Sequence, residues 1–170
     1  MPNWCKNFLR VSGPDRDLAH FMRQAAPAKT QRKPKTASPP EAFSFQRLVP
    51  LSVLRGTATE GEESTPANRW GCRGDAIRSQ FDESRDGAAQ YRFATPWNPP
   101  MKFLREVSEL WPTLEFILDY DEPMLTFYGT VCARAGRITH FYVEPGLSGP
   151  GKRPREKETK EGSSSLTRHT

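Results

Sequence analysis

The densest group of reactive side chains in the sequence is the run from Trp70 to Asp75. It places an indole, a thiol (Cys72), a guanidinium (Arg73) and a carboxylate within six residues, in a segment without helical or strand periodicity. Loops of this kind often carry binding or catalytic residues, so Trp70, Arg73 and Asp75 are candidate site residues. The structural alternative is that Trp70 covers the open face of a sheet while Arg73 and Asp75 pair locally.

A second group of polar side chains comprises Asp119, Asp121 and Glu122, which end a strand-like run. Paired carboxylates can act as acid and base when burial separates their pKa values. The two-residue period of a strand puts Asp119 and Asp121 on one side, where solvated charges at a sheet edge would prevent association instead. Glu122 is a candidate binding residue. Trp97 is another, and it either caps the core, with Trp97→Ala costing about 3–5 kcal/mol, or contacts a partner.

Patterns for metal, cofactor or nucleophilic chemistry are missing from the sequence. His20, His140 and His169 form no zinc-binding spacing with each other or with a cysteine, and no glycine-rich phosphate loop occurs. A thiol nucleophile would need Cys72 or Cys132 to meet His140 in space. We therefore expect no catalytic residue, no metal and no cofactor, and the cysteine usage suits a reducing cytoplasm.

Alternating and helical hydrophobic patterns predict the elements that position these residues. The first strand is expected at 4–12 and the first helix at 15–24, followed by a region of loops at 25–89 with one apolar segment at 42–50. A strand at 90–95, a helix at 101–111 and a strand at 114–120 follow, and the short gap Arg134-Ala135-Gly136-Arg137 predicts a closing hairpin. Residues 145–170 have the composition of a disordered tail. The sequence has no run of about 18 apolar residues, so no membrane span is expected.

The positive charge is concentrated in two segments. The chain carries +5 overall, but residues 18–40 hold five basic residues and no acid, and residues 151–170 hold six basic residues and three acids. The rest has 14 basic and 17 acidic residues, a net charge near −3. Any nucleic-acid contact is therefore expected at Lys29, Arg32, Lys33 and Lys35 together with the tail.

Several aromatic and proline motifs resemble, in the same order, the ferredoxin-like domain family typified by YubB. They are Asn3-Trp4-Cys5-x-Asn7-x-Leu9-x-Val11-x-Gly13, Phe43-x-Phe45-x-x-Leu48-x-Pro50, Tyr91-x-Phe93-x-Thr95-x-Trp97-x-Pro99-Pro100 and Tyr120-x-Glu122-Pro123. Gly74 stands where the family tends to have a tryptophan, so a pocket lined by that tryptophan would be larger or absent here. The resemblance implies a domain of unknown function from plasmids, phages and integrative elements.

Pattern and resemblance together predict one α+β domain over 1–144. It would have the ferredoxin-like split βαβ fold: a four-stranded antiparallel sheet with two helices on one face and an insertion between the first helix and the second strand. By analogy with mobile elements, we expect a non-catalytic binding protein that engages a host or element-encoded protein. Two alternatives stay open: a nucleic-acid-binding module using the basic loop, the tail and the aromatic sheet face, and a small enzyme with its site around Trp70–Asp75. The sequence does not indicate an oligomeric state.

Overall fold

The computed structural model of the chain describes residues 3–26, 41–51, 65–82, 87–123 and 127–141. It contains, in chain order, β1 (Trp4–Ser12), α1 (Asp15–Ala25), α2 (Phe45–Leu48), α3 (Pro66–Trp70), β2 (Ile77–Asp82), β3 (Ala88–Pro96), α4 (Met101–Leu110), β4 (Glu115–Glu122), β5 (Phe127–Arg134) and β6 (Arg137–Phe141). No described helix is both long enough and apolar enough to cross a membrane. The tail predicted at 145–170 lies outside the described residues.

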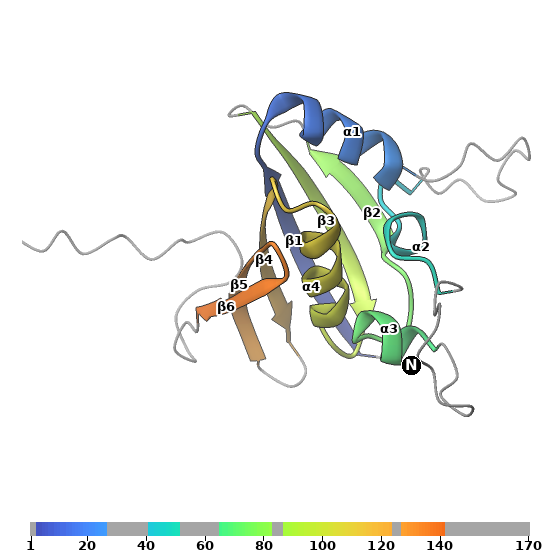
Figure 1. Cartoon of the computed structure of the whole chain (residues 1–170). Coiled ribbons are helices and arrows are strands. Elements are labelled where there is room, and N and C mark those ends of the chain that lie inside the picture. Colours follow the sequence, from blue (N-terminus) through green and yellow to red (C-terminus); the bar gives the residue numbers. More distant parts are fainter. Residues whose placement is uncertain (1–2, 27–40, 52–64, 83–86, 124–126, 142–170) are drawn as a thin grey trace, which may run out of the picture.

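The strands form one antiparallel sheet in the order β2-β3-β1-β4-β5-β6 (Figure 1). The N-terminal strand β1 lies inside the sheet, paired with β3 on one side and β4 on the other. The first four strands with α1 and α4 therefore make the β-α-β-β-α-β arrangement of a split βαβ fold. The hairpin of β5 and β6 extends this unit at its β4 edge.

The prediction of a four-stranded sheet was wrong, because the sheet has six strands. Strand β2 lies inside the region that was predicted as loops and insertion. Its alternation is interrupted by a register shift between Ile77 and Gln80 and by the left-handed backbone of Arg78 (φ 53°). A bulge of this kind breaks the two-residue period on which strand prediction depends.

The two long helices cover the same face of the sheet, as predicted. Phe21 of α1 packs edge-on against Tyr91 of β3 and Phe116 of β4. Phe103 of α4 contacts Phe43 and Phe45, and all these rings except that of Tyr91 are at most 1% exposed. The predicted apolar segment at 42–50 is thus confirmed as part of the core.

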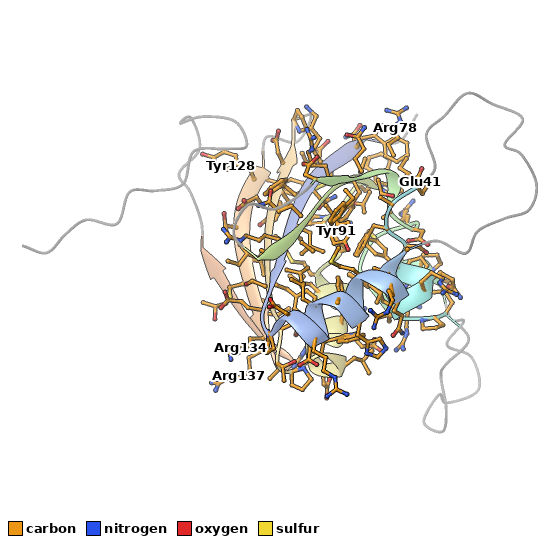
Figure 2. All side chains as sticks on the ribbon, turned by 90° about the horizontal axis from the view of Figure 1, so that it is seen from above. Glu41, Arg78, Tyr91, Tyr128, Arg134 and Arg137 are labelled. Atoms are coloured by element: carbon orange, nitrogen blue, oxygen red, sulfur yellow. The ribbon has the colours of Figure 1, made fainter. Side chains whose placement is uncertain are left out.

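The segment at Glu41 and Ala42 packs along the outer edge of β2. On β2, the Glu41 carboxylate accepts hydrogen bonds from the backbone N–H groups of Arg78 (2.9 Å) and Ser79, and the N–H of Ala42 donates to the Ser79 carbonyl (3.2 Å). Figure 2 shows Glu41 beside Arg78, with Arg134 and Arg137 together in another part of the molecule. Glu41 and Ala42 therefore cover the outer edge of β2 at Arg78 and Ser79.

Candidate functional site

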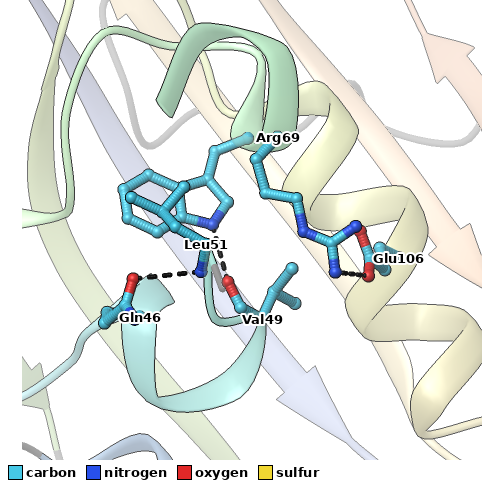
Figure 3. A network of polar contacts seen from close by, with 6 residues as sticks. Gln46, Val49, Leu51, Arg69 and Glu106 are labelled. Carbon is cyan, nitrogen blue, oxygen red and sulfur yellow. Dashed lines mark hydrogen bonds and ion pairs between the residues drawn. The ribbon is translucent and has the colours of Figure 1, made fainter. Parts of the chain in front are cut away.

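Trp70 is part of the core rather than a surface ligand-binding group. Its ring is 2% exposed and packs edge-on against Phe45 (centroids 5.6 Å apart). The indole Nε1 donates to the Val49 carbonyl at 2.8 Å, so α3 is fastened to the segment after α2 (Figure 3). On the other side of α3, Arg69 forms an ion pair with Glu106 of α4. Burial raises the pKa of Glu106, although Arg69 opposes the rise.

Asp75 organises the start of α2 from thirty residues away in the sequence. Its carboxylate accepts hydrogen bonds from the Ser44 hydroxyl (2.8 Å) and from the backbone N–H groups of Phe45 (2.5 Å) and Ala76 (2.7 Å). A carboxylate at a helix N-terminus satisfies N–H groups that have no partner within the helix. No ion pair joins it to Arg73, which is exposed, within the part of the chain that the structure describes.

Trp97 lies on the surface, in a turn between β3 and α4 that we call the Trp97 turn (residues 96–100). Its side chain is 36% exposed, and its backbone has a left-handed φ of 68°. Of the two expectations for Trp97, this exposure favours a surface residue over a cap on the core. A bulky residue at positive φ is a conformational outlier that costs about 1–2 kcal/mol, so the surrounding structure must impose it.

A chain of buried hydrogen bonds holds the Trp97 turn in place. The Asn7 side chain donates to the Thr95 hydroxyl at 2.9 Å, and that hydroxyl donates to the Asn98 carbonyl at 2.8 Å. Asn7 is 3% exposed and Thr95 is fully buried. From the other side, the N–H of Trp97 donates to the Asn3 carbonyl at 2.9 Å. Side chains inside the core thus fix the backbone that presents an exposed tryptophan.

The loop that contains Arg73 adjoins this turn. A Cβ atom at Gly74 would lie 3.3 Å from the Pro96 side chain, and one at Gly71 would lie 3.1 Å from the Lys102 backbone nitrogen in the first turn of α4. A large side chain at position 74 would therefore rest on Pro96, beside Trp97. Because this chain has glycine there, no side chain from position 74 covers Pro96. Arg73 and Trp97 are the two predicted site residues that lie exposed on segments in contact.

Glu122 lies at the same end of the sheet but inside it. The register places Thr95 of β3 and Glu122 of β4 on either side of Cys5, all three facing the helices. Glu122 is 0% exposed, so a partner on the surface cannot reach its carboxylate in this conformation. The motifs around Asn3, Thr95 and Glu122, far apart in the sequence, thus meet at one end of the sheet.

The thiols are held in their protonated form. Burial, helped by the carboxylates of Glu122 and Asp121, raises the pKa of Cys5 to about 12. Burial raises the pKa of Cys72 to about 12 as well, opposed by a hydrogen bond to the Gly74 carbonyl. Burial and the nearby Glu115 raise the pKa of Cys132. A thiol of this kind is a poor nucleophile at neutral pH. Whether Cys72 or Cys132 meets the side chain of His140 lies outside what the structure describes.

Asp119 and Asp121 lie on the face of the sheet opposite the helices. The prediction that they sit at a sheet edge was wrong, because β4 is flanked by β1 and β5. Asp119 accepts a hydrogen bond from the Thr130 hydroxyl at 2.5 Å, and Asp121 lies opposite Lys6 in the register. These are partly exposed carboxylates on an interior strand. Among the described residues, no group of histidine, cysteine and acidic side chains is arranged to hold a metal ion.

The basic residues predicted to contact nucleic acid lie outside the described residues. They are Lys29, Arg32, Lys33 and Lys35. What the structure adds is that Trp97, for which the sequence left a core position and a surface contact open, lies exposed. The signal was present in the sequence: a tryptophan between a strand end and two prolines, in a segment too short to bury it.

Comparison with known proteins assigns the domain type. Residues 78–161 match the family model described as "Ferredoxin-like domain in Api92-like protein". Among solved structures, the chain is similar to the crystal structure of a protein Api92 from Yersinia pseudotuberculosis, with 11% sequence identity and a TM-score of 0.49. That similarity covers 85% of this chain and 100% of the other. A search of curated proteins found no match. The family-model match over residues 78–161 indicates a ferredoxin-like domain, in agreement with the strand order of the sheet.

Proposed function

We propose that this ferredoxin-like protein is a non-catalytic binding protein that engages a protein partner through the Trp97 turn. The observation that carries the proposal is Trp97 itself, exposed and held at positive φ by buried hydrogen bonds. Exposing an indole and straining its backbone both cost free energy. Strain of this kind clusters at functional sites, and tryptophan and arginine are enriched among the residues that dominate binding energy.

The chemistry around the turn favours a protein over a nucleic acid. Asn98, next to Trp97, is exposed, and so is Arg73, which directly precedes the glycine that lies beside Pro96. Outside residues 18–40 and 151–170 the chain has 14 basic and 17 acidic residues, so the body has no excess positive charge to attract phosphates. The setting in a mobile genetic element, and a host or element-encoded partner in the cytoplasm, are supported by the resemblance to the YubB-like family alone.

The test compares partner capture by three forms of the immobilised full chain: wild type, Trp97→Gly and Leu110→Ala. Leu110, on α4, is the matched control because it is an exposed apolar residue (56%) away from the turn. We expect wild type and Leu110→Ala to retain the same protein from cell extract after nuclease treatment and in high salt, and Trp97→Gly to lose it.

Two results would contradict the proposal. Retention of the same protein by Trp97→Gly would place the contact elsewhere. Loss of the captured material after nuclease treatment would favour nucleic acid as the partner. So would an affinity for a defined duplex that falls by about 0.9 log unit per log unit of salt for each phosphate contacted. Replacing Lys29, Arg32, Lys33 and Lys35 by alanine and removing the tail would then abolish binding.

A further inference from the structure

The outer edge of β6 presents backbone groups that have no partner among the described residues, and the hairpin geometry fixes their positions. The turn between β5 and β6 has two central residues, Ala135 (φ 47°) and Gly136 (φ 76°). Positive φ at both positions defines a type I′ hairpin, in which the residues flanking the turn exchange hydrogen bonds with each other. Arg134 and Arg137 are that pair. Because hydrogen-bonded and non-hydrogen-bonded pairs alternate, Thr139 and Phe141 also direct their backbone groups toward β5.

The backbone N–H and C=O groups of Ile138 and His140 therefore point away from the sheet. No described residue hydrogen-bonds to them. The opposite edge is different, since Glu41 and Ala42 occupy the outer backbone groups of Arg78 and Ser79 on β2. Within the described residues, one edge of the sheet is capped at Arg78 and Ser79 and the other is open. Open edges pair with further strands, so β6 is the place where this sheet can be extended.

We infer that two copies of this chain pair through their β6 strands, in antiparallel orientation around Thr139. In this register Ile138 of one copy faces His140 of the other, and the outward groups of both residues form four backbone hydrogen bonds across the two-fold axis. Shifting the axis to Ile138 would bring in Gly136, whose N–H already donates to the Ser108 hydroxyl at 3.1 Å. The register around Thr139 uses the outward groups without breaking that bond.

The side chains that the structure describes on β6 are compatible with this pairing. Thr139 is exposed and would lie directly opposite its own copy, a cross-strand pair that is favourable in antiparallel sheets. Arg137 would face position 141 of the second copy. The two Arg137 residues would be four positions apart along the strand, about 14 Å, which exceeds the screening length at physiological salt. No like charges are brought together among the described side chains of β6.

The cover over Arg78 and Ser79 on the β2 edge favours an association of two copies. A two-fold contact uses the same surface on both chains and closes upon itself, whereas a sheet with two open edges could grow without end. The resulting dimer has a continuous twelve-stranded sheet with β2 at both ends. Each copy keeps its Trp97 turn, which lies on β3 and α4 and takes no part in the β6 contact, so dimerisation does not depend on the proposed partner.

The test is the molar mass of the full chain in solution, measured by light scattering after gel filtration at increasing concentration. We expect a mass approaching twice 19.3 kDa. Thr139→Lys places two like charges opposite each other and should return the mass to that of one chain. His140→Pro removes an outward N–H while leaving the bonds between β5 and β6 intact, and it should have the same effect. Gln80→Lys, the same charge change on exposed β2, should leave the dimer unchanged.

Other outcomes would overturn the inference. A wild-type chain that stays monomeric at every concentration rejects the pairing, and a dimer that forms only after residues 142–170 are removed identifies those residues as the occupant of the edge. A dimer that persists in both Thr139→Lys and His140→Pro lies elsewhere on the molecule. Circular dichroism of each variant separates loss of pairing from loss of folding.

Discussion

At the scale of single residues, the chain uses polar side chains from distant positions to fix local backbone. Asn7 and Thr95 act on the Trp97 turn, and Asp75 acts on the start of α2. Each is buried or partly buried and satisfied by hydrogen bonds, as buried polar groups must be. Their removal therefore affects stability, whereas changing an exposed residue that they position affects binding.

Trp97→Gly should bind no partner and yet fold as well as the wild type. Glycine adopts φ near 68° without strain, and this relief offsets the lost contacts of a side chain that is already 36% exposed. We expect the free energy of unfolding, measured by urea denaturation, to change by less than about 1 kcal/mol. A loss of about 3 kcal/mol or more, typical of a buried aromatic residue, would show that Trp97 belongs to the core.

Asp75→Ala should destabilise the fold by about 1.5–3 kcal/mol, the range for hydrogen bonds to a charged group. The variant leaves the N–H groups of Phe45 and Ala76 without their acceptor. Exposed Arg73→Ala is the control from the same loop and should stay within about 0.5 kcal/mol of the wild type. Equal effects of the two variants in chemical denaturation would contradict the capping role of Asp75.

At the scale of elements, prediction from the sequence succeeded where periodicity is uninterrupted. Strands β1 and β4 alternate strictly and β3 alternates from Ala89 onward, and the hairpin before β6 carries glycine at a position that requires positive φ, Gly136 (φ 76°). It failed at β2, because the bulge at Arg78 disrupts the alternation. Of the candidate site, Trp97 and Arg73 could be named from the sequence. That their segments adjoin could not be predicted, because it depends on Gly74 lying beside Pro96, 22 positions later in the sequence.

The cap on β2 gives a prediction at this scale. Glu41→Gln weakens the charge-assisted bonds to Arg78 and Ser79, so the outer edge of β2 opens more often. Hydrogen exchange of these two amides should become faster, while the amide of Leu9 in the sheet interior should exchange as in the wild type. Uniform acceleration at all three positions would instead indicate global destabilisation.

At the scale of the whole molecule, buried thiols make stability depend on alkaline pH. The pKa values of Cys5 and Cys72 rise to about 12 from an ordinary value of 9.0. Because the folded state binds these protons more tightly, the stabilisation is complete below pH 9.0 and is lost as pH rises toward 12. The double variant Cys5→Ala, Cys72→Ala should lose less unfolding free energy than the wild type between these values. Parallel pH profiles would contradict the role of the thiols.

The central position of β1 has a consequence for how the chain is made. Trp4 pairs with Pro96, 92 positions later in the sequence. At a synthesis rate of about 5–20 residues per second, β1 leaves the ribosome roughly 5–18 s before that partner exists. During this interval its alternating apolar residues have no sheet to join. The nascent chain is therefore exposed to aggregation for most of its translation, and it completes its sheet only after β3 and then β4 emerge on either side of the first strand.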